Sequence, residues 1–464
     1  MHLTKKTLGR LIGMPGCVQK TWILSYAAMT LLLLLSCSGG STVDIESDFT
    51  LIGSQNPSSV SIPDLDGLRN MAFVLTSSPP LGVFVFELDH IVPPLPFEFY
   101  NFNKGLQGVP DDLVIIKEDL AFITTGNEFE GVWAFNPNPS DQGSFQFFSS
   151  YIYTGAELTL PREAEDSRGV LVDHVRPTLT SGVALSHGKV YISTSNFTQV
   201  GPNPACAPGT IQIIGLDEST YPPQLTELGD HRLIITTDFN PGEITPLGDH
   251  ILLVTNTGVL AIRDDAGVPL SEGSVDVIDT DLDCIVATYP LGFAAPSFKK
   301  IALTPDGTRG YLGSAAYNHV YELDLTGLEN YLGICNDEDP PVLADKVLHG
   351  SRNPNPPIRA TLDPEGSTNL VPQVVLDYGG TRAYATGYNS GTLAVLELET
   401  VPGFPSPRTP IEVIQVTDPM PTQNEAGPGP LAVRPGIPGE SFQGPDLYVV
   451  TGLPIGELRG IYTY

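Results

Sequence analysis

The segment Lys299–Thr326 limits the fold more narrowly than any other part of the chain. A short apolar run ends in a turn at Pro305–Gly307, a second run carries Tyr311, and a third alternates from Val320 to Leu323. Alternation of apolar and polar residues between Pro/Gly turns is typical of β-strands. The segment therefore predicts one sheet module of three antiparallel strands.

The same pattern recurs along the chain, each time with a large apolar residue in the second strand and a small residue three positions later. Self-similarity of this kind predicts a repeat architecture, in which each unit buries its faces against its neighbours. The positions aligned on Tyr311 are Phe73, Phe122, Tyr191, Leu252, Tyr311, Tyr384 and Tyr448.

The copies at Tyr311 and Tyr384 agree most closely. Gly-Thr-Arg precedes the aromatic residue at the same offset in both, and the third strands, 320–324 and 393–397, keep the same 73-residue register. Each copy is interpreted as a four-stranded antiparallel blade with a less regular outer strand. Blades of this kind stack radially, so the sequence predicts an all-β protein with a β-propeller fold.

Gly-Thr-Arg-x-Tyr with its flanking strands resembles the YVTN-type seven-bladed β-propeller repeat of bacterial and archaeal surface proteins. The resemblance covers residues 48–464 and implies seven four-stranded blades in a single domain. The copies are spaced more widely than in that family, and the excess falls in Pro/Gly-rich loops. After Tyr448 the last blade has room for only one more strand, at 460–464. We expect residues 48–52 to supply its outer strand and to close the ring, which removes an open sheet edge.

Residues 1–36 are not expected to belong to the fold. Four basic residues precede an apolar run from Trp22 to Leu35, whose length suits a signal peptide better than a membrane span. The run ends at Leu34–Cys37, which resembles the bacterial lipobox. The resemblance implies that residues 1–36 are removed as a lipoprotein signal peptide, that Cys37 is lipidated, and that residues 37–47 form a tether. An ordinary cleavable signal with a coincidental Cys is the alternative.

A lipidated Cys37 would hold the protein on a membrane surface without spanning the membrane. Ser38 follows it, where an Asp would resemble the signal for retention in the inner membrane. The sequence therefore predicts a bacterial envelope lipoprotein, on the outer membrane in preference to the inner one.

The charge balance limits the partners. Removal of the four basic residues of the signal from the 23 in the chain leaves 19 against 53 acidic residues, a formal charge of −34. Such a surface repels nucleic acid, which we do not expect as a partner, and attracts cations or basic groups. Solubility or adaptation to salt explains the same charge without any partner.

The resemblance also implies where a ligand would bind. In related propellers, the connections between outer and inner strands share one face with the mouth of the central channel. The loop 154–182 falls on this face and carries Asp173, His174 and Arg176, and His319 is assigned to the same mouth. Carboxylate and imidazole groups together can bind a metal ion or transfer protons. Solvated loop charges are the alternative, because these residues have no diagnostic spacing.

The segment Asp279–Asp283 has the alternating carboxylates of a calcium loop. However, Cys284 stands where an EF-hand has Gly, and the Glu at position twelve is missing. A solvated acidic turn is therefore favoured over a calcium site, and no other cofactor or metal site is predicted. The eight His are scattered without a paired motif.

The cysteines lie outside any zinc, thioredoxin or haem spacing. Cys284 and Cys335 are assigned to third-to-fourth-strand connections of consecutive blades, on the same face. In an oxidising envelope they can form a disulfide, with two independent thiols as the alternative. Cys206 maps to the opposite face and has no predicted partner.

No arrangement of residues in the sequence indicates a catalytic site. We therefore expect a non-catalytic binding or scaffold protein that presents loops to a protein, glycan or cation partner. The alternative is a periplasmic or surface enzyme, such as a lactonase-like hydrolase or a lyase, with its site at the channel mouth. Convergence of three or more carboxylate and imidazole groups in the channel would favour the enzyme, and an apolar, uncharged mouth would count against it.

Overall fold

The computed structural model describes residues 49–51, 57–77, 81–88, 96–101, 109–126, 130–138, 147–153, 157–198, 205–228, 232–263, 266–335, 339–350, 356–360, 370–388, 390–398, 410, 412–416, 428–435, 447–451 and 457–461. The expected signal peptide (1–36), the lipidated Cys37 and the tether (37–47) lie outside these residues. Within them, no helix has the length and apolar character needed to cross a membrane.

Antiparallel four-strand meanders follow one another along the chain. The first three consist of β2 (Pro57–Ser61), β3 (Met71–Thr76), β4 (Gly82–Glu87) and β5 (Pro96–Asn101); of β6 (Val109–Lys117), β7 (Leu120–Gly126), β8 (Glu130–Phe135) and β9 (Phe147–Tyr153); and of β11 (Leu171–Ser186), β12 (Lys189–Thr198), β13 (Ala205–Asp217) and β15 (Arg232–Ile235). Additional strands at their edges are β10 (Leu158–Glu165) and β14 (Gln224–Thr226).

The chain continues in the same way. The next meanders consist of β16 (Pro241–Leu247), β17 (Ile251–Asn256), β20 (Gly273–Asp279) and β21 (Cys284–Gly292); of β22 (Ala302–Leu303), β23 (Arg309–Leu312), β24 (His319–Asp324) and β25 (Val347–His349), with β26 (Ile358–Arg359); and of β27 (Val374–Leu376), β28 (Arg382–Gly387), β29 (Thr392–Glu397) and β30 (Glu412–Gln415). A separate hairpin joins β18 (Leu260–Arg263) to β19 (Ala266–Pro269).

The last sheet combines the two ends of the described chain. Its order is β1-β33-β32-β31, with β31 (Pro428–Val433), β32 (Leu447–Thr451), β33 (Glu457–Ile461) and β1 (Phe49–Leu51). β1 runs antiparallel to β33, with Phe49 opposite Arg459 and Leu51 opposite Glu457.

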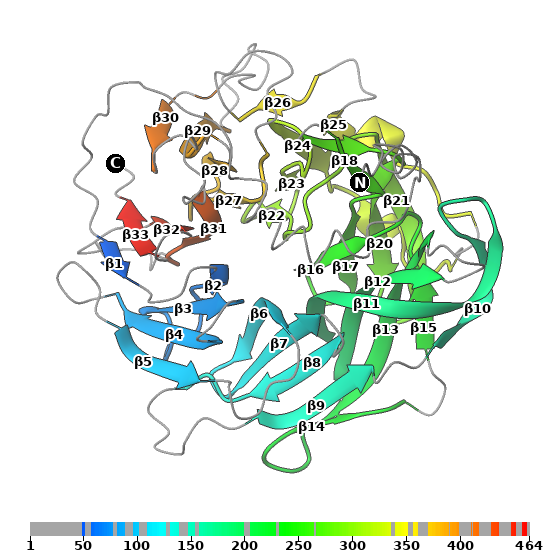
Figure 1. Ribbon diagram of the computed structural model, residues 1–464, viewed down its shortest axis with the longest axis horizontal. Helices are drawn as coiled ribbons and strands as arrows, with labels where there is room; N and C mark the ends of the chain where they lie inside the picture. The colour runs from blue at the N-terminus through cyan, green and yellow to red at the C-terminus, as the bar shows by residue number, and fades with distance from the viewer. Residues whose placement is uncertain are drawn as a thin grey trace, which may run out of the picture.

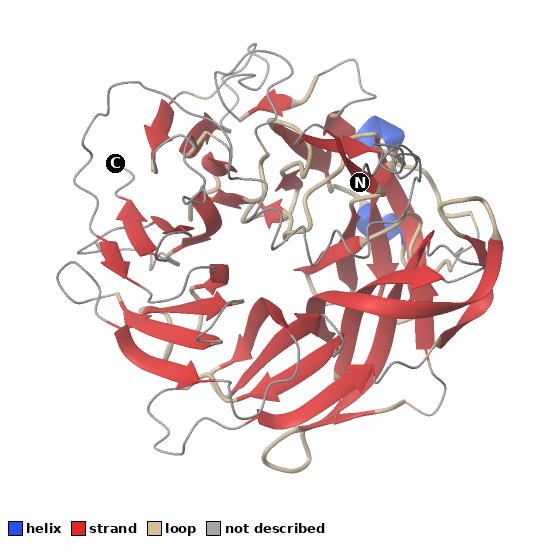
Figure 2. Cartoon of the chain, in the orientation of Figure 1, coloured by secondary structure: helices blue, strands red, loops and turns tan. Residues whose placement is uncertain are grey.

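The sheets stand side by side in a ring, with β2, β6, β16, β22, β27 and β31 toward its centre (Figure 1). Almost all of the described secondary structure is strand (Figure 2), and helix is confined there to the short turns η2 (Leu328–Tyr331) and η3 (Ala344–Lys346). A ring of radial antiparallel meanders is a β-propeller. The prediction of an all-β propeller is confirmed.

Two neighbouring meanders touch closely enough to form one ten-stranded sheet. Leu179 of β11 pairs with Gly126 at the end of β7. A Cβ atom on Gly126 would lie 2.6 Å from Leu179 Cδ1, so a larger residue here would require the Leu179 side chain to move.

The large residue of each second strand explains why the repeats need their neighbours. Phe73, Phe122, Tyr191, Tyr311, Tyr384 and Tyr448 are all buried, and each packs in a cluster with residues of the next sheet around the ring. Tyr448, for example, packs with Val60 and Phe86 of the first meander. Each blade therefore completes its core only in the ring.

Leu252 is the exception to the aligned series. It packs toward the preceding sheet, with Tyr191, whereas Leu253 packs toward the following one, with Leu312 and Tyr321. Successive strand residues face opposite sides of a sheet, so a shift of one residue reverses the face. The alignment on Leu252 is therefore wrong by one position, and Leu253 is the equivalent residue.

The Gly-Thr-Arg turns are structural. Gly307 and Gly380 have φ values of 68° and 66°, a left-handed conformation that glycine adopts without a steric cost. The preceding acids fix the turn: Asp306 Oδ1 accepts the N–H of Thr308 at 3.1 Å, and Asp377 Oδ1 accepts the N–H of Thr381 at 2.7 Å. These turns build the blade edge, as the sequence suggests.

Candidate functional site

The inner strands surround a cavity of about 230 Å³ at the centre of the ring. Its lining comes from β2, β6, β16 and β31 and from the residues just before β22 and β27. The polar side chains in this lining belong to Ser59, Ser61, Asp112, Glu243, Lys299, Lys300 and Gln373. Segments that are far apart in the sequence thus meet in one polar cavity.

A shared local structure aims side chains into this cavity. β2, β6, β16 and β31 each contain a proline followed by a shift of strand register. Proline lacks the N–H that a ladder needs, and the irregularity that follows turns the next side chains away from the regular pleat. The residues two positions after these prolines all line the cavity: Ser59, Asp112, Glu243 and Pro430.

Glu243 is 6% exposed, and residues of the neighbouring blade bind its carboxylate. Lys299 Nζ lies 2.6 Å from its Oε1, and the N–H of Lys300 donates to Oε2 at 3.3 Å. The close approach depends on Gly242, because a Cβ there would lie 2.4 Å from the Phe298 carbonyl oxygen. Glycine thus allows the chain carrying Lys299 to reach Glu243.

Burial raises the pKa of Glu243 to about 7, and the negative charge of Asp112 adds to the rise. Lys299 and Lys300 oppose it by stabilising the carboxylate. A carboxyl group in this state can gain or lose a proton near neutral pH.

Asp112 is 2% exposed and only half satisfied by the protein. Its Oδ1 accepts the Ser59 hydroxyl at 3.2 Å and the N–H of Leu113 at 2.8 Å. No described protein group donates to its Oδ2, which is buried. A buried acceptor of this kind favours a donor, either water or a ligand group. The cavity therefore offers a site for an amine, a hydroxyl or a cation.

The residues that sequence reasoning assigned to the mouth do not line this cavity. Residues 158–165 and 171–182, expected as part of a loop, belong to the strands β10 (158–165) and β11 (171–186). On β11, Asp173 Oδ1 lies 2.8 Å from His174 Nδ1, and both side chains are exposed. Arg176 lies over the ring of Phe197, 6.0 Å from its centroid.

His319 lies on a different blade, at the start of β24. Its ring centroid is 5.4 Å from that of Tyr317 and 6.2 Å from that of Tyr321. Burial lowers the pKa of His319, and the positive charge of Arg359 lowers it further. No contact among the described residues joins His319 to Asp173, His174 or Arg176, so these four remain predictions without a shared site.

The acidic turn between β20 and β21 is only partly solvated, because Asp281 is exposed and its two acidic neighbours are not. The side chains of Asp279 and Asp283 are buried, and both are used inside the protein. Asp279 accepts backbone N–H groups, and Asp283 pairs with Lys189, 2.5 Å away, and with Arg232. The expectation of a solvated turn therefore applies to Asp281 and not to Asp279 and Asp283, whose carboxylates are engaged with different protein groups.

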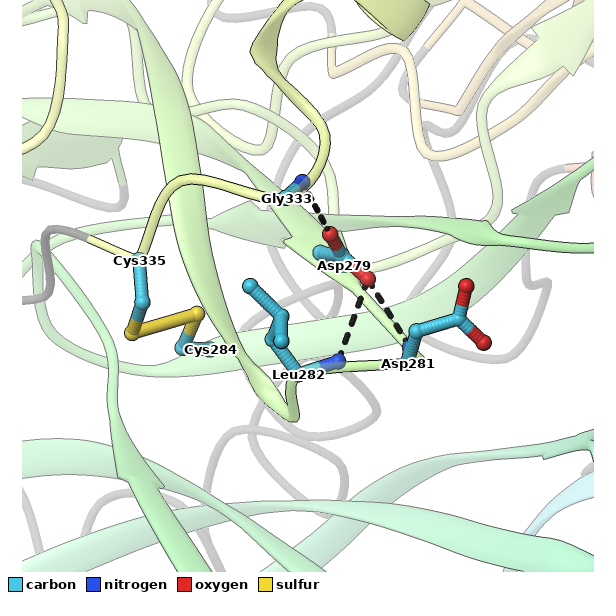
Figure 3. The surroundings of a disulfide bond; sticks show 6 residues. All are labelled: Asp279, Asp281, Leu282, Cys284, Gly333 and Cys335. Atoms are coloured by element: carbon cyan, nitrogen blue, oxygen red, sulfur yellow. Dashed lines mark hydrogen bonds between the residues drawn. A yellow bond between two sulfur atoms is a disulfide. The ribbon is translucent and has the colours of Figure 1, made fainter.

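Cys284 and Cys335 form a disulfide, with their Cα atoms 5.8 Å apart (Figure 3). It connects the start of β21 to the segment that follows η2, in the next meander. Cys206 is buried at the start of β13, where its N–H donates to the Ser167 hydroxyl at 3.2 Å.

Sequence reasoning missed the channel residues, although a signal was present. Each inner strand either contains a proline or follows one within a few residues: Pro57, Pro110, Pro177, Pro241, Pro296, Pro372 and Pro428. Proline is accepted at the first residue of a strand or at a bulge, so a proline at a regular place in each repeat marks the inner strand. The polar residues just after these prolines were therefore identifiable as channel residues.

No protein-family model matches this chain, and no curated protein matches it. Solved structures do. Hydrazine synthase of Kuenenia stuttgartiensis matches with a TM-score of 0.50 at 10% identity, over 89% of this chain and 95% of that one. At this identity the likeness concerns the fold alone. The chain has a β-propeller fold.

Two further structures have lower scores. The β-propeller domain of Cps50 (Swd1) from Myceliophteria thermophila has a TM-score of 0.49 at 10% identity, covering 89% of this chain and 99% of that one. The Dos1 propeller has a TM-score of 0.46 at 11% identity, covering 90% and 83%.

Proposed function

We propose that this protein is a binding protein of the bacterial cell envelope that receives a small hydrogen-bond donor in its central cavity. The observation that carries the proposal is Asp112, a residue of the cavity wall whose buried Oδ2 atom has no donor among the described residues. The ligand group is an amine or a hydroxyl of a protein or glycan partner.

Charge and size support this class of ligand. The chain has a formal charge of −30, and in the cavity wall the carboxyl groups of Asp112 and Glu243 offset the charges of Lys299 and Lys300. A negative field attracts amines and cations and repels anionic groups. At about 230 Å³ the cavity is smaller than most drug-sized sites, so it suits one sugar unit or the end of one side chain.

The binding test uses glucosamine, which offers an amine and hydroxyls, with glucose as the hydroxyl-only comparison. We expect glucosamine to give measurable heat with the wild-type chain in calorimetry and to raise its melting temperature. Asp112→Asn removes the acceptor at nearly constant shape and should weaken the binding at least tenfold. The proposal fails if neither sugar binds the wild type, or if Asp112→Asn binds as well as the wild type.

We also propose that the ring has seven blades and belongs with YVTN-type propellers, with β1 completing the last blade. This count treats the ten-stranded sheet as two blades joined at Leu179 and Gly126. Antiparallel pairing of β1 with β33 and the packing of Tyr448 against Val60 support closure. Deletion of residues 49–51 should lower the melting temperature, which thermal unfolding would measure.

The envelope anchor is a separate proposal. It is supported by the lipobox-like Leu34–Cys37 and by the position of β1, twelve residues after Cys37. At about 3.3–3.6 Å per extended residue, the propeller would lie within roughly 40 Å of the membrane. Labelling with a palmitate analogue should mark the wild type and not Cys37→Ser, and an unlabelled wild type would refute the anchor.

An enzyme remains the second candidate because of Glu243. A buried carboxyl group with a pKa near 7, beside Lys299, is suited to general acid–base catalysis. The described cavity holds two carboxyl groups and no imidazole, so it meets neither outcome set for the sequence-based alternatives. Hydrolysis of a lactone panel that disappears in Glu243→Gln would favour a lactonase-like activity over simple binding.

A further inference from the structure

Three hairpin turns bring two imidazoles and a carboxylate together on the surface. His187 lies between β11 and β12, His250 just before β17, and Asp281 between β20 and β21. His187 Nδ1 is 3.1 Å from Asp281 Oδ1, and His250 Nδ1 is 3.0 Å from Asp281 Oδ2. The two imidazole centroids are 4.8 Å apart. We call these three residues the three-turn cluster.

The cluster is distinct from the central cavity, since none of its residues lines that cavity. Its turns join first to second strands and third to fourth strands, so antiparallel topology places them at one end of the blades. The outer-to-inner connections, including β10, leave from the opposite end. The cluster therefore lies on the face that the sequence did not mark for binding.

Hydrogen bonds between the turns fix the spacing of the cluster. The Ser186 hydroxyl contacts both neighbouring turns, donating to the Asp249 carbonyl at 2.9 Å and lying 3.1 Å from the Thr280 hydroxyl oxygen. The N–H of Thr280 donates to the His250 carbonyl at 3.0 Å. Ser186, Asp249 and Thr280 directly precede His187, His250 and Asp281 in the sequence. The three side chains are thus positioned before any ligand binds.

The turn that carries Asp281 is also held by contacts with the segment around Gly333. Asp279 Oδ1 accepts the N–H of Asp281 at 2.8 Å, and Asp279 Oδ2 accepts the N–H of Gly333 at 2.8 Å (Figure 3). The Cys284–Cys335 disulfide ties the same two segments together. Figure 3 shows the carboxylate of Asp281 directed away from the disulfide.

The other side of this turn is fixed by Asp283. Its carboxylate accepts the Tyr191 hydroxyl at 2.6 Å and pairs with Lys189, and both residues lie on β12. β12 begins two residues after His187, so this contact links the first and third turns of the cluster. Asp279 and Asp283 are structural supports, which leaves Asp281 as the exposed carboxylate of the turn.

The backbone at His187 gives an independent indication. Its φ is +51°, followed by Gly188 at +71°, a two-residue hairpin turn in which Asn or Gly is the usual first residue. Non-glycine residues are uncommon in this conformation and carry some steric cost, although His adopts it more often than most of them. A residue that is unfavourable for its turn and faces a second His and an Asp is more readily explained by a ligand than by folding.

We propose that His187, His250 and Asp281 bind a divalent transition-metal ion of the zinc class. Imidazole nitrogen with one carboxylate oxygen is a common donor set for such ions, whereas calcium selects oxygen alone. In a tetrahedral site with bonds of about 2.0–2.2 Å, ligand atoms lie roughly 3.3–3.5 Å apart. The two imidazole nitrogens lie 3.1 and 3.0 Å from different oxygens of Asp281, and one donor atom from each residue lies within 4.8 Å of the others, so a bidentate carboxylate or a modest closing of the turns brings the donors to this spacing.

The site is open. The side chains of His187, His250 and Asp281 are 38%, 49% and 56% exposed. Three protein ligands leave at least one coordination position for water or for a group of a partner. The ion would therefore tie the three turns to one another and leave a position open to a further ligand.

The test uses the full chain, treated with EDTA and transferred to a chelator-free buffer. Zinc chloride is titrated by calorimetry, and cobalt chloride is followed by its visible absorption, which reports imidazole coordination. We expect one ion per chain in the wild type. His187→Asn keeps a residue that tolerates the turn. This variant and His250→Asn should each weaken zinc binding at least tenfold and abolish the cobalt spectrum.

His174→Asn is the matched control, because His174 is also an exposed histidine paired with an aspartate. It should bind zinc and cobalt as the wild type does. Melting curves without metal should be nearly the same for all variants, which separates loss of ligands from loss of fold. The proposal is overturned if the wild type binds neither ion, or if His187→Asn and His250→Asn bind as tightly as the wild type. Either result would leave the cluster as an ion pair alone.

Discussion

The central cavity and the three-turn cluster both gather ionisable side chains from several blades, but they differ in burial. In the cavity, Asp112 and Glu243 are almost fully buried. Each buried carboxylate therefore needs a positively charged or hydrogen-bonding partner, or must be neutralised by binding a proton. In the cluster, His187, His250 and Asp281 remain solvated, so they come together at little electrostatic cost. Removal of one partner should therefore affect folding in the cavity and ligand binding in the cluster.

The largest effect is expected for Lys299→Met. Without the Lys299 ammonium the pKa of Glu243 rises further, so at pH 8 the folded variant must either bind a proton or bury an unpaired carboxylate, which should cost up to about 3–5 kcal/mol of unfolding free energy. At pH 5 the carboxyl can be protonated and the cost should be smaller. Urea denaturation at both pH values measures the difference.

The control for this change is Lys346→Met. Lys346 lies 3.7 Å from Asp324 in a more exposed pair and should contribute less than about 1 kcal/mol. Equal losses of unfolding free energy for both variants at pH 8 would show that burial does not set the contribution of the Glu243–Lys299 pair to stability.

The disulfide tests the support of the cluster. Cys284→Ser with Cys335→Ser opens a cross-link between residues 51 apart, which corresponds to about 4 kcal/mol in the chain-entropy estimate. The same change should weaken zinc binding to the cluster, because the Asp281 turn loses its tie to the Gly333 segment. Chemical denaturation and zinc calorimetry measure the two effects. Unchanged values in both would show that the disulfide supports neither.

Glu243→Gln tests the protonation of the cavity. The folded pKa of Glu243 is raised to about 7, so its contribution to stability is present below its unfolded pKa and is lost as the pH rises to about 7. The wild type should lose on the order of 3 kcal/mol relative to Glu243→Gln between about pH 4.5 and pH 7. Parallel pH profiles for the two proteins would contradict the raised pKa.

The smallest effect on folding is expected for His187→Gly. Glycine adopts the left-handed conformation of this turn without the cost that histidine carries, so the metal-free protein should become slightly more stable, by less than about 1 kcal/mol. Thermal unfolding in EDTA measures the change. A marked loss of stability would mean that His187 belongs to the folding contacts and not to a ligand site.

The fold was predictable because it depends on local periodicity. Turn residues, strand alternation and the buried Tyr311 and Tyr384 repeat in register, and a repeat that buries one face against the next specifies a ring. The error at Leu252 has the same origin. In a strand of apolar residues on both faces, alternation disappears and the register cannot be read.

The sites were not predictable in the same way, because each is assembled across blades. Asp112, Glu243 and Lys299 come from three inner strands, and their spacing in sequence depends on loops of unequal length. The sequence contains no paired histidine motif and therefore predicts no metal site. His187 and His250 meet through tertiary structure, and neither shares an element with the other.

The prolines at the inner strands have a consequence for how such a protein can diversify. The residue two positions after the proline projects toward the axis, while an apolar residue that follows it, such as Ile244, packs in the blade core. The selectivity of the channel and the stability of the blades are thus encoded in separate positions. A lineage, or a designer, could exchange a buried pair together, such as Ser59 with Asp112 or Glu243 with Lys299, and obtain new ligand preferences from the same ring.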